Sequence, residues 1–332
     1  MTLPTRPLGT SGLEITTIGL GTWAIGGGGW LYGWGPQDDE QSLATMYRAV
    51  ELGINWFDTA GVYGHGHSEE VVARFLREVS DDRRPLVFTK CGPTWDGRDP
   101  FKEEPSDLAP GNVRRQCEDS LRRLGVERLD LLQFHWPDDG KVPIEESWAE
   151  MARLVAEGKV RYAGVSNFDT GLLARCEAIM HVDSLQQEFS LIERGTADKE
   201  LPWVREHGTG VLCYSPMGAG QLTDGFTAER VRRMPEEDWR RREFREPGLS
   251  RNLALRDALR PIAARHEASV MSVALAWLLA WDGVTAVIVG GRRPAQIDGW
   301  IGAADLRLTG ADLSEIADAV RATGAGQGPD HP

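Results

Sequence analysis

Eight short apolar runs alternate with amphipathic segments along the chain, and this alternation limits the folds available to it. In the segments between the runs, apolar residues recur at helical spacing, as at Leu43, Met46, Tyr47 and Val50. Strand-like runs that alternate with helical segments predict βα units around a parallel sheet. The predicted strands cover residues 18–21, 54–57, 86–89, 129–134, 161–165, 184–187, 210–214 and 285–289.

Glycines close four of the predicted helices, at Gly53, Gly125, Gly158 and Gly208. Glycine adopts the left-handed conformation that ends a helix at no steric cost, so short connections into the next strand are predicted. Eight parallel strands can form an open doubly wound sheet or a closed barrel. The open dinucleotide-binding sheet has Gly-x-Gly-x-x-Gly between its first strand and first helix, and the glycines near residues 19–29 lack that spacing.

Polar side chains stand at the ends of six consecutive predicted strands, which favours the barrel. A barrel brings the carboxyl ends of all its strands to one face, where such residues meet. A chain of 332 residues is within the size of one barrel domain. We therefore predict an α/β protein that forms a single (β/α)8 TIM barrel domain over residues 1–332. The strand-end residues are Asp58, Lys90, His135, Ser166, Asn167, Gln187 and Tyr214.

Several segments lie outside the repeat. Residues 6–16 have the pattern of a β-hairpin with a turn at residues 9–12, and we expect this N-terminal hairpin to plug the bottom of the barrel. The tail from about residue 322 is rich in Gly and Pro and is predicted to be loose. The insert 93–110 and the charged stretch 227–251 exceed ordinary loop length and are predicted to be lids or binding segments.

Charge and composition restrict the partners. Lys plus Arg number 37 against 50 Asp plus Glu, and the net charge of −13 disfavours nucleic acid and membrane surfaces and favours a small-molecule substrate. The longest apolar run, residues 271–281, is too short to cross a membrane, and residues 1–10 have no apolar signal segment. The four cysteines are widely spaced, as in reduced thiols. We expect a cytoplasmic protein that is a monomer or a weak homo-oligomer.

The titratable residues near the strand ends suit carbonyl reduction. A tyrosine hydroxyl has an ordinary pKa of about 10 and is a weak acid. The ammonium of Lys90 beside Tyr63 is expected to lower that pKa, while Asp58 keeps Lys90 charged. A neutral His135 can donate a hydrogen bond to the same substrate oxygen. Tyr63 is thereby predicted to protonate an alkoxide as it forms.

Two further patterns carry no predicted site. His65, His67 and Glu69 lack a matching set of ligands elsewhere in the chain, so no metal is predicted. The basic run 240–242 is flanked by acidic residues, which is typical of a solvated helix or lid rather than of a nucleic-acid site.

The segment 57–69, Phe-Asp-Thr-Ala-Gly-Val-Tyr-Gly-His-Gly-His-Ser-Glu, resembles the signature of the aldo-keto reductases. The segments 87–90 (Val-Phe-Thr-Lys) and 132–135 (Leu-Gln-Phe-His) are similar to the lysine and histidine segments of that family, with further matches at 164–168 and 214–218. The resemblance implies a (β/α)8 barrel that binds a nicotinamide cofactor without a Rossmann motif. It also implies that Tyr63 is the proton donor, that Asp58 and Lys90 tune its pKa, and that His135 orients the substrate.

The same resemblance implies a cofactor site. Three side chains match positions that hold the nicotinamide carboxamide (Ser166, Asn167 and Gln187), and Tyr214 matches an aromatic residue that stacks on the nicotinamide ring. The segment 215–222 is expected to offer backbone N–H groups to the pyrophosphate, and the segment 290–296 to close over the adenosine phosphate. The residues implied for the cofactor are Trp23, Asp58, Ser166, Asn167, Gln187, Tyr214, Ser215, Pro216, Met217, Gly218, Gly220, Leu222, Gly290, Gly291, Arg292 and Gln296.

The residues implied for the substrate are Trp23, Tyr63, His135 and Trp136. A pocket with these aromatic walls favours aromatic or aliphatic carbonyls over highly charged ones.

One position departs from the family pattern. The family commonly has asparagine where Trp300 stands, four residues after Gln296, so we expect adenine to be held differently. Arg292 and Arg293, at a predicted helix start, favour NADP (as NADPH) over NAD. The predicted function is NADPH-dependent reduction of an aldehyde or ketone to an alcohol. The alternatives are an NAD(P)-dependent sugar or polyol dehydrogenase and a cofactor-sensing regulatory subunit with little turnover.

Overall fold

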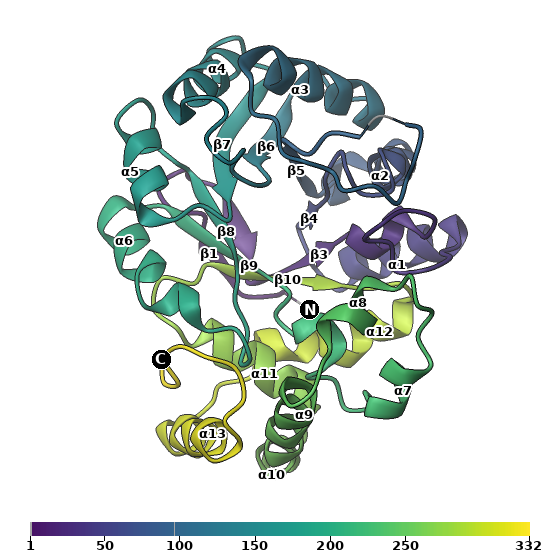
Figure 1. Ribbon diagram of the computed structural model, residues 1–332, viewed down its shortest axis with the longest axis vertical. Helices are drawn as coiled ribbons and strands as arrows, with labels where there is room; N and C mark the ends of the chain where they lie inside the picture. The colour runs from purple at the N-terminus through teal and green to yellow at the C-terminus, as the bar shows by residue number, and fades with distance from the viewer. Residues whose placement is uncertain (1, 96) are drawn as a thin grey trace.

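Eight parallel strands close into a barrel in the computed structural model, which describes residues 2–95 and 97–332 (Figure 1). The strands follow one another round the barrel in chain order, and the last pairs with the first. Each predicted strand is present, which confirms the (β/α)8 fold. The strands are β3 (Ile18–Gly21), β4 (Trp56–Asp58), β5 (Leu86–Cys91), β6 (Leu129–Phe134), β7 (Val160–Ser166), β8 (Ser184–Glu188), β9 (Gly210–Tyr214) and β10 (Ala286–Gly290).

Helices surround the barrel on its outer face (Figure 1). The α-helices are α1 (Asp39–Glu51), α2 (His67–Glu78), α3 (Pro110–Leu124), α4 (Ile144–Ala156), α5 (Thr170–Glu177), α6 (Glu200–His207), α7 (Ala228–Arg232), α8 (Trp239–Glu243), α9 (Gly248–Ala258), α10 (Arg260–Arg265), α11 (Val270–Leu279), α12 (Pro294–Trp300) and α13 (Gly310–Thr323). Short 3-10 helices are η1 (Trp23–Gly26), η2 (Asp81–Arg83), η3 (Gly195–Ala197), η4 (Gly218–Gly220) and η5 (Ile301–Ala304). Within the described ranges, every helix is too short or too polar to cross a membrane.

The helices form where the apolar spacing predicts them. Met46 of α1 and Trp148 of α4 are both fully buried against the barrel. Helices α3 and α6 end at Gly125 and Gly208, which adopt φ of 66° and 71° as the predicted caps require. The apolar layer between the helices and the barrel therefore holds the repeat together.

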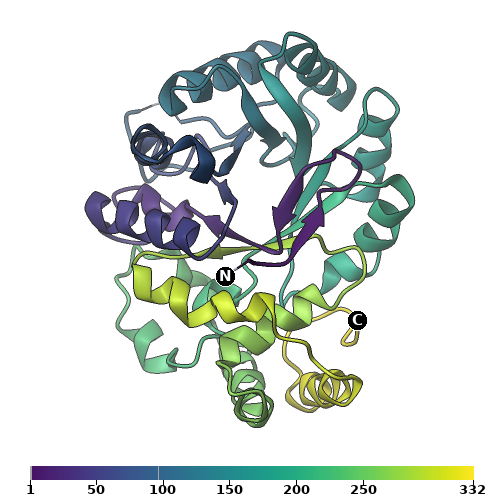
Figure 2. The same cartoon turned by 180° about the vertical axis from the view of Figure 1, so that it is seen from behind.

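An N-terminal hairpin closes one end of the barrel, as predicted. Its strands β1 (Thr5–Pro7) and β2 (Glu14–Thr16) pair antiparallel and lie across the rear opening (Figure 2). Leu8 and Ile15, both 0% exposed, pack in the barrel interior against side chains that include Trp56. The hairpin thus blocks the amino ends of the strands, and the carboxyl ends remain for a site.

The C-terminal tail packs on the barrel, which differs from the prediction of a loose tail. The guanidinium of Arg194 donates to the carbonyl oxygens of Ala325 at 3.1 Å and Gly328 at 3.2 Å. Ala325 is only 1% exposed. Two glycines of the tail allow close packing: a Cβ on Gly326 would lie 2.3 Å from the carbonyl oxygen of Ile192, and a Cβ on Gly328 would lie 2.6 Å from the carbonyl carbon of Arg194.

Removal of the hairpin's buried side chain tests the plug. We expect Leu8→Ala to lower the free energy of unfolding by about 2–5 kcal/mol, because it leaves a cavity at the closed end of the barrel. Urea unfolding monitored by circular dichroism measures this loss. Glu14→Ala, at an exposed position of the same hairpin, is the matched control, with an expected change within about 0.5 kcal/mol. Equal stability of the two variants would contradict the plug.

Candidate active site

The ammonium of Lys90 lies at the centre of the site, near the carboxyl end of β5. Its Nζ atom donates to Asp58 Oδ1 at 2.5 Å, to the carbonyl oxygen of Thr59 at 3.0 Å and to Tyr63 Oη at 3.4 Å. The Lys90 side chain is 0% exposed. All three N–H groups of one buried cation are therefore directed to oxygens on β4 and the loop that follows it.

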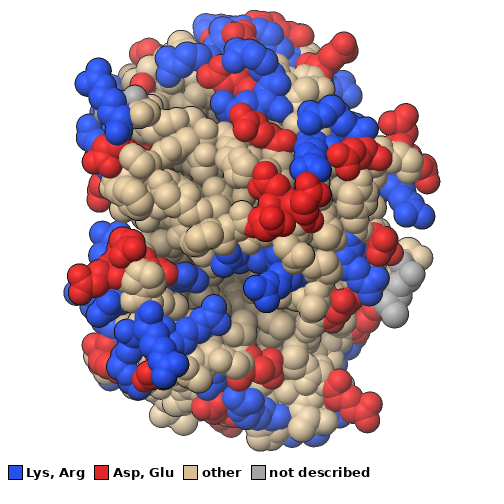
Figure 3. Space-filling model, turned by 90° about the vertical axis from the view of Figure 1, so that its right-hand side faces the viewer, with Lys and Arg blue, Asp and Glu red and all other residues tan. Residues whose placement is uncertain are grey.

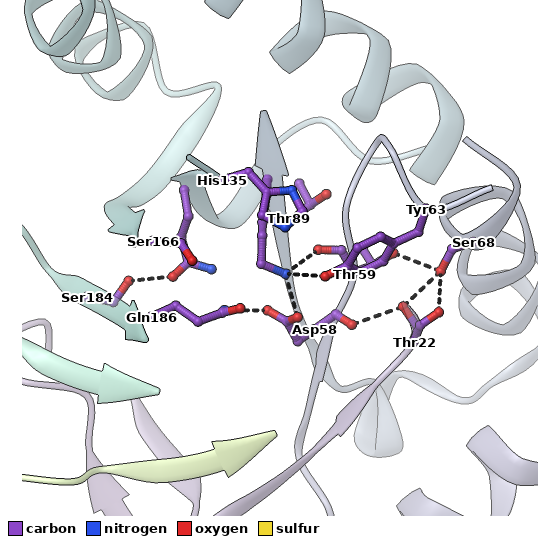
Figure 4. A network of polar contacts seen from close by, with 12 residues as sticks. Thr22, Asp58, Thr59, Tyr63, Ser68, Thr89, His135, Ser166, Ser184 and Gln186 are labelled. Atoms are coloured by element: carbon purple, nitrogen blue, oxygen red, sulfur yellow. Dashed lines mark hydrogen bonds and ion pairs between the residues drawn. The ribbon is translucent and has the colours of Figure 1, made fainter. Parts of the chain in front are cut away.

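Asp58 is held from a second side by Gln186, which donates from Nε2 to Asp58 Oδ2 at 2.9 Å (Figure 4). The neighbouring Gln187, which the resemblance assigns to the nicotinamide carboxamide, lies on the other face of β8. Successive side chains of a strand point to opposite faces, so Gln186 of β8 points into the barrel and Gln187 points away. Gln187 donates instead to the carbonyl oxygen of Phe168 at 2.8 Å. The spacing of Ser184 and Gln186 on one strand face was the signal that the sequence contained.

A chain of hydroxyl groups fixes the loop after β4 (Figure 4). Thr22 Oγ1 donates to the carbonyl oxygen of Asp58 at 2.9 Å, and Ser68 Oγ donates to Thr22 Oγ1 at 2.8 Å. The hydroxyls of Ser68 and Thr59 lie 3.0 Å apart. These contacts join the loop after β3, the loop after β4 and the start of α2, so the oxygens around Lys90 keep their places.

Burial is the main cause of the pKa shifts of Tyr63, Asp58 and Lys90. It raises the pKa of Tyr63 well above the ordinary value, and the negative charge of Asp58 adds to the shift. Burial therefore acts against the lowering of the Tyr63 pKa that we expect from Lys90, whose ammonium is already paired with Asp58. Burial also raises the pKa of Asp58 and lowers the pKa of Lys90. Tyr63 is consequently a protonated phenol at neutral pH.

His135 follows β6 and faces the phenol. The His135 and Tyr63 rings meet edge to face, with centroids 5.6 Å apart. Burial lowers the pKa of His135 well below the ordinary value, and the charge of Lys90 adds to this, so the imidazole is neutral at pH 7. Among the described residues, no group hydrogen-bonds to its buried Nδ1. A neutral imidazole beside a phenol can donate one hydrogen bond to a ligand oxygen.

The predicted residues at the ends of β7 and β9 lie together. Asn167 adopts φ of 63° and donates from Nδ2 to the carbonyl oxygen of His135 at 3.0 Å. The hydroxyl of Tyr214 donates to Asn167 Oδ1 at 2.8 Å, and Ser166, 1% exposed, lies beside them. These three side chains therefore continue the polar wall from His135 round the mouth.

Several backbone N–H groups of the loop after β9 donate to carbonyl oxygens of the same loop. The N–H of Gly218 donates to the carbonyl oxygen of Ser215 at 2.8 Å, and the N–H groups of Gly220 and Leu222 donate to that of Met217, each at 3.1 Å. These groups were predicted to bind a phosphate, and in this structure they are engaged within the loop. Ser215 is held at φ of 51°, so the loop turns sharply away from β9.

The backbone N–H groups at the start of α12 also have hydrogen-bond partners within the protein. Gln296 Oε1 accepts from the N–H groups of Arg292 at 2.8 Å and Arg293 at 3.1 Å, so this side chain caps the helix. The guanidinium of Arg292 donates to Gln37 Oε1 at 2.7 Å and to the carbonyl oxygens of Trp34 and Pro36. Arg292 thus joins the loop after β10 to the loop after β3.

Trp300, the position that departs from the family pattern, is buried in the core. It is 1% exposed and packs among the apolar side chains between the barrel and the helices. An indole in this place faces the protein interior, so it does not substitute for an asparagine side chain that contacts a ligand.

Three tryptophans, Trp23, Trp34 and Trp239, form a bridge across the mouth. Trp239 of α8 stacks on Trp23 at 5.2 Å and meets Trp34 edge-on at 5.8 Å. The guanidinium of Arg240 lies 4.4 Å from the Trp34 ring centre, and Trp23 also stacks beside Tyr63 at 6.2 Å. The charged stretch thus reaches the site, but its sequence has no periodicity that singles out Trp239.

The insert after β5 reaches the mouth from the opposite side. His65 hydrogen-bonds to Glu104 at 2.5 Å and stacks on Trp95 at 5.1 Å. His67 instead pairs with Asp39, and Glu69 accepts a hydrogen bond from Arg123. His65, His67 and Glu69 therefore have different partners. The described residues contain no cluster of three His, Cys, Asp or Glu side chains suited to a metal.

Large apolar side chains are exposed on three of the loops at the mouth. Tyr32 is 36% exposed, Phe101 50% and Trp136 47%, and these residues follow β3, β5 and β6. We call them the apolar rim. Trp136 thus lies on the loop after β6 and is half exposed, and its role in binding substrate stays a prediction.

Comparison with known proteins gives a consistent result. The model of the aldo/keto reductase family matches residues 17–321. The NADH-specific methylglyoxal reductase of Escherichia coli is 30% identical over 95% of this chain and 98% of its own. An aldo-keto reductase of Bacillus subtilis is 31% identical over 87% of this chain and 85% of its own. The structure of a glycerol dehydrogenase from Gluconobacter oxydans superposes with a TM-score of 0.87 at 35% identity, over 98% of this chain and 97% of that one.

Fold, site and similarity agree on a barrel oxidoreductase of the class that uses nicotinamide cofactors. The chain belongs to the aldo-keto reductase family.

Removal of one charge tests the buried ion pair. We expect Asp58→Asn to lower the free energy of unfolding at neutral pH by about 3–5 kcal/mol, because the Lys90 ammonium then lacks its counterion. Between the lowered folded-state pKa of Lys90 and its ordinary value of 10.5, the unfolded chain binds more protons, so the variant gains stability as pH rises. Urea unfolding at neutral and alkaline pH measures both effects.

The double variant Asp58→Asn, Lys90→Met is the control, since it removes both charges and should regain most of the lost stability. A single variant as stable as the wild type at neutral pH would contradict the ion pair.

Proposed function

We propose that the protein reduces an aldehyde or ketone to an alcohol, with a reduced nicotinamide cofactor as hydride donor and Tyr63 as proton donor. The observation that carries the proposal is the contact of Lys90 Nζ with Tyr63 Oη at 3.4 Å, with Lys90 held by Asp58. The apolar rim favours carbonyl compounds with an aromatic or aliphatic group.

The geometry suits proton donation. Because Lys90 donates to the oxygen of Tyr63, the phenol directs its own proton away from the ammonium. A carbonyl oxygen beside Tyr63 and His135 would receive two donors, and these stabilise negative charge as it forms on that oxygen. The phenolate left after transfer lies next to the Lys90 ammonium. The raised pKa of Tyr63 keeps the donor protonated at neutral pH.

The residues present suit the cofactor, whose bound form supplies the hydride. Asn167 offers a carboxamide at the carboxyl end of β7, and Tyr214 offers an aromatic ring at the end of β9. Gln186 presents its amide inside the barrel beside Asp58, and we propose it for the role that the resemblance gives to Gln187. We assign the nicotinamide end to these side chains together with Ser166.

Four arginines favour NADP over NAD. Arg230, Arg240 and Arg293 are close enough to Arg292 for their charges to lower its pKa, although burial contributes more. Arg230 and Arg240 line a cavity of about 480 Å³ between α7, α8 and the loop after β3. On the side that carries α1, α8 and α12, basic side chains gather around a hollow (Figure 3). Arg240 is paired with Asp238 at 2.5 Å and Arg292 with Gln37 at 2.7 Å, so Arg230 and Arg293 are the side chains that we assign to a phosphate ester, which supports NADP.

Tyr63→Phe tests the proton donor. We expect kcat for aldehyde reduction to fall by about 100-fold or more, because the substituted ring lacks the acidic proton. The dissociation constant of the cofactor, measured by quenching of tryptophan fluorescence, should stay within about twofold. Loss of NADPH absorbance with a panel that includes methylglyoxal and an aryl aldehyde measures turnover.

Equal turnover by the wild type and Tyr63→Phe would refute this role. Absence of turnover by the wild type with every member of the panel would favour the cofactor-sensing alternative. Faster oxidation of a polyol than reduction of its carbonyl partner at neutral pH would favour the dehydrogenase.

Arg293→Ala tests the cofactor choice. Arg293 is exposed at the start of α12, and we expect its removal to raise the KM for NADPH by about tenfold while the KM for NADH stays the same. Steady-state rates with both cofactors measure this. Arg161→Ala, at the amino end of β7, is the matched control. The Escherichia coli relative is described as NADH-specific, so better use of NADH than of NADPH by the wild type would overturn the preference for NADP.

A further inference from the structure

The loop that carries Tyr63 is held between two contacts. On one side, its backbone lies directly on η1. A Cβ on Gly64 would lie 2.2 Å from the carbonyl oxygen of Gly26, and a Cβ on Gly26 would lie 2.8 Å from the backbone nitrogen of Gly64. Only glycine at both positions allows the two backbones to approach so closely.

On the other side, the loop rests on the side chain of Arg123, which comes from α3. A Cβ on Gly61 would lie 2.9 Å from Arg123 Nη2, and a Cβ on Gly66 would lie 2.9 Å from Arg123 Cδ. Gly61 and Gly66 stand on either side of Tyr63 in the sequence. The guanidinium therefore passes beneath the loop at both of its ends.

Glu69 holds Arg123 in this position. Its side chain is 0% exposed, and Oε2 accepts from Arg123 Nε at 2.6 Å. Its second oxygen, Oε1, accepts from Thr89 Oγ1 at 2.5 Å. Thr89 directly precedes Lys90 on β5, so one carboxylate connects the support of the Tyr63 loop to the strand that carries Lys90.

The same carboxylate acts on Lys90 through its charge. The negative charge of Glu69 raises the pKa of Lys90 and so opposes the effect of burial. Removal of that charge would leave Arg123 unpaired beneath the Tyr63 loop. Both effects favour deprotonation of Tyr63 and Lys90 at a lower pH than in the wild type.

We propose that the Glu69–Arg123 ion pair is a positioning device for proton transfer, which sets the separation of Tyr63 Oη from Lys90 Nζ by joining the Tyr63 loop to β5. The proposal rests on the function proposed above. Glu69 and Arg123 contact Thr89 and the backbone of the Tyr63 loop, so both act through Tyr63 and Lys90.

The experiment compares Glu69→Gln and Arg123→Met with Arg123→Lys and with a control at the partner of another arginine of α3. Arg114 of α3 pairs with Glu150 at 2.6 Å, and the Glu150 side chain is only 6% exposed, so Glu150→Gln removes a similar charge away from the Tyr63 loop. Circular dichroism confirms that each variant folds. The assay is aldehyde reduction by the full chain with NADPH over a range of pH.

We expect kcat to fall by about 10- to 100-fold in Glu69→Gln and Arg123→Met, because displacement of the donor by a fraction of an ångström slows the transfer. The KM for NADPH should stay within about twofold. Arg123→Lys should restore most of kcat, and Glu150→Gln should match the wild type. In Glu69→Gln, the alkaline decline of kcat should move to lower pH.

Wild-type kcat and pH profile in Glu69→Gln and Arg123→Met would overturn the proposal. So would an equal fall of kcat in Glu150→Gln, since that would indicate general destabilisation. If the wild type shows no turnover, the proposed function fails, and the ion pair is judged by crystal structures of the wild type and Arg123→Met. A longer separation of Tyr63 Oη from Lys90 Nζ in the variant then supports the positioning role, and an unchanged separation overturns it.

Discussion

A lysine ammonium that is removed from water needs an acceptor for each of its three N–H groups, and the site depends on meeting this need at Lys90. The acceptors come from β4 and the loop after it, in the form of Asp58, Thr59 and Tyr63. Strands β4 and β5 are neighbours in the barrel, which makes this convergence possible. The hydrogen bond that stabilises the cation is also the one that orients the phenol, so stability and chemistry depend on the same atoms.

Two sets of contacts then hold the loops around this centre. Above the mouth, the tryptophan bridge joins the loop after β3 to α8, and Arg292 joins that loop to the start of α12. Below the Tyr63 loop, Glu69 and Arg123 join α2 to α3. A rigid barrel supplies fixed strand ends, and these lateral contacts decide where the loops between them lie.

Much of the fold could be predicted because its signals are local. The eight strands, the hairpin and the helix ends at Gly125 and Gly208 each depend on a few neighbouring residues. The tail was mispredicted because its packing depends on Arg194, more than a hundred residues away. We named Gln187 rather than Gln186 because we did not use the alternation of Ser184 and Gln186 on one strand face, which the closed barrel turns inward.

The sequence by itself determined the number and order of the strands and the residue types at their carboxyl ends, because periodicity and glycine positions act over short distances. Tertiary structure alone decided the proton affinity of Tyr63, the engagement of Arg292 with Trp34 and the support of the Tyr63 loop by Arg123. The physical reason is that desolvation and charge pairing depend on groups brought together from distant parts of the chain, and a linear sequence does not state those distances.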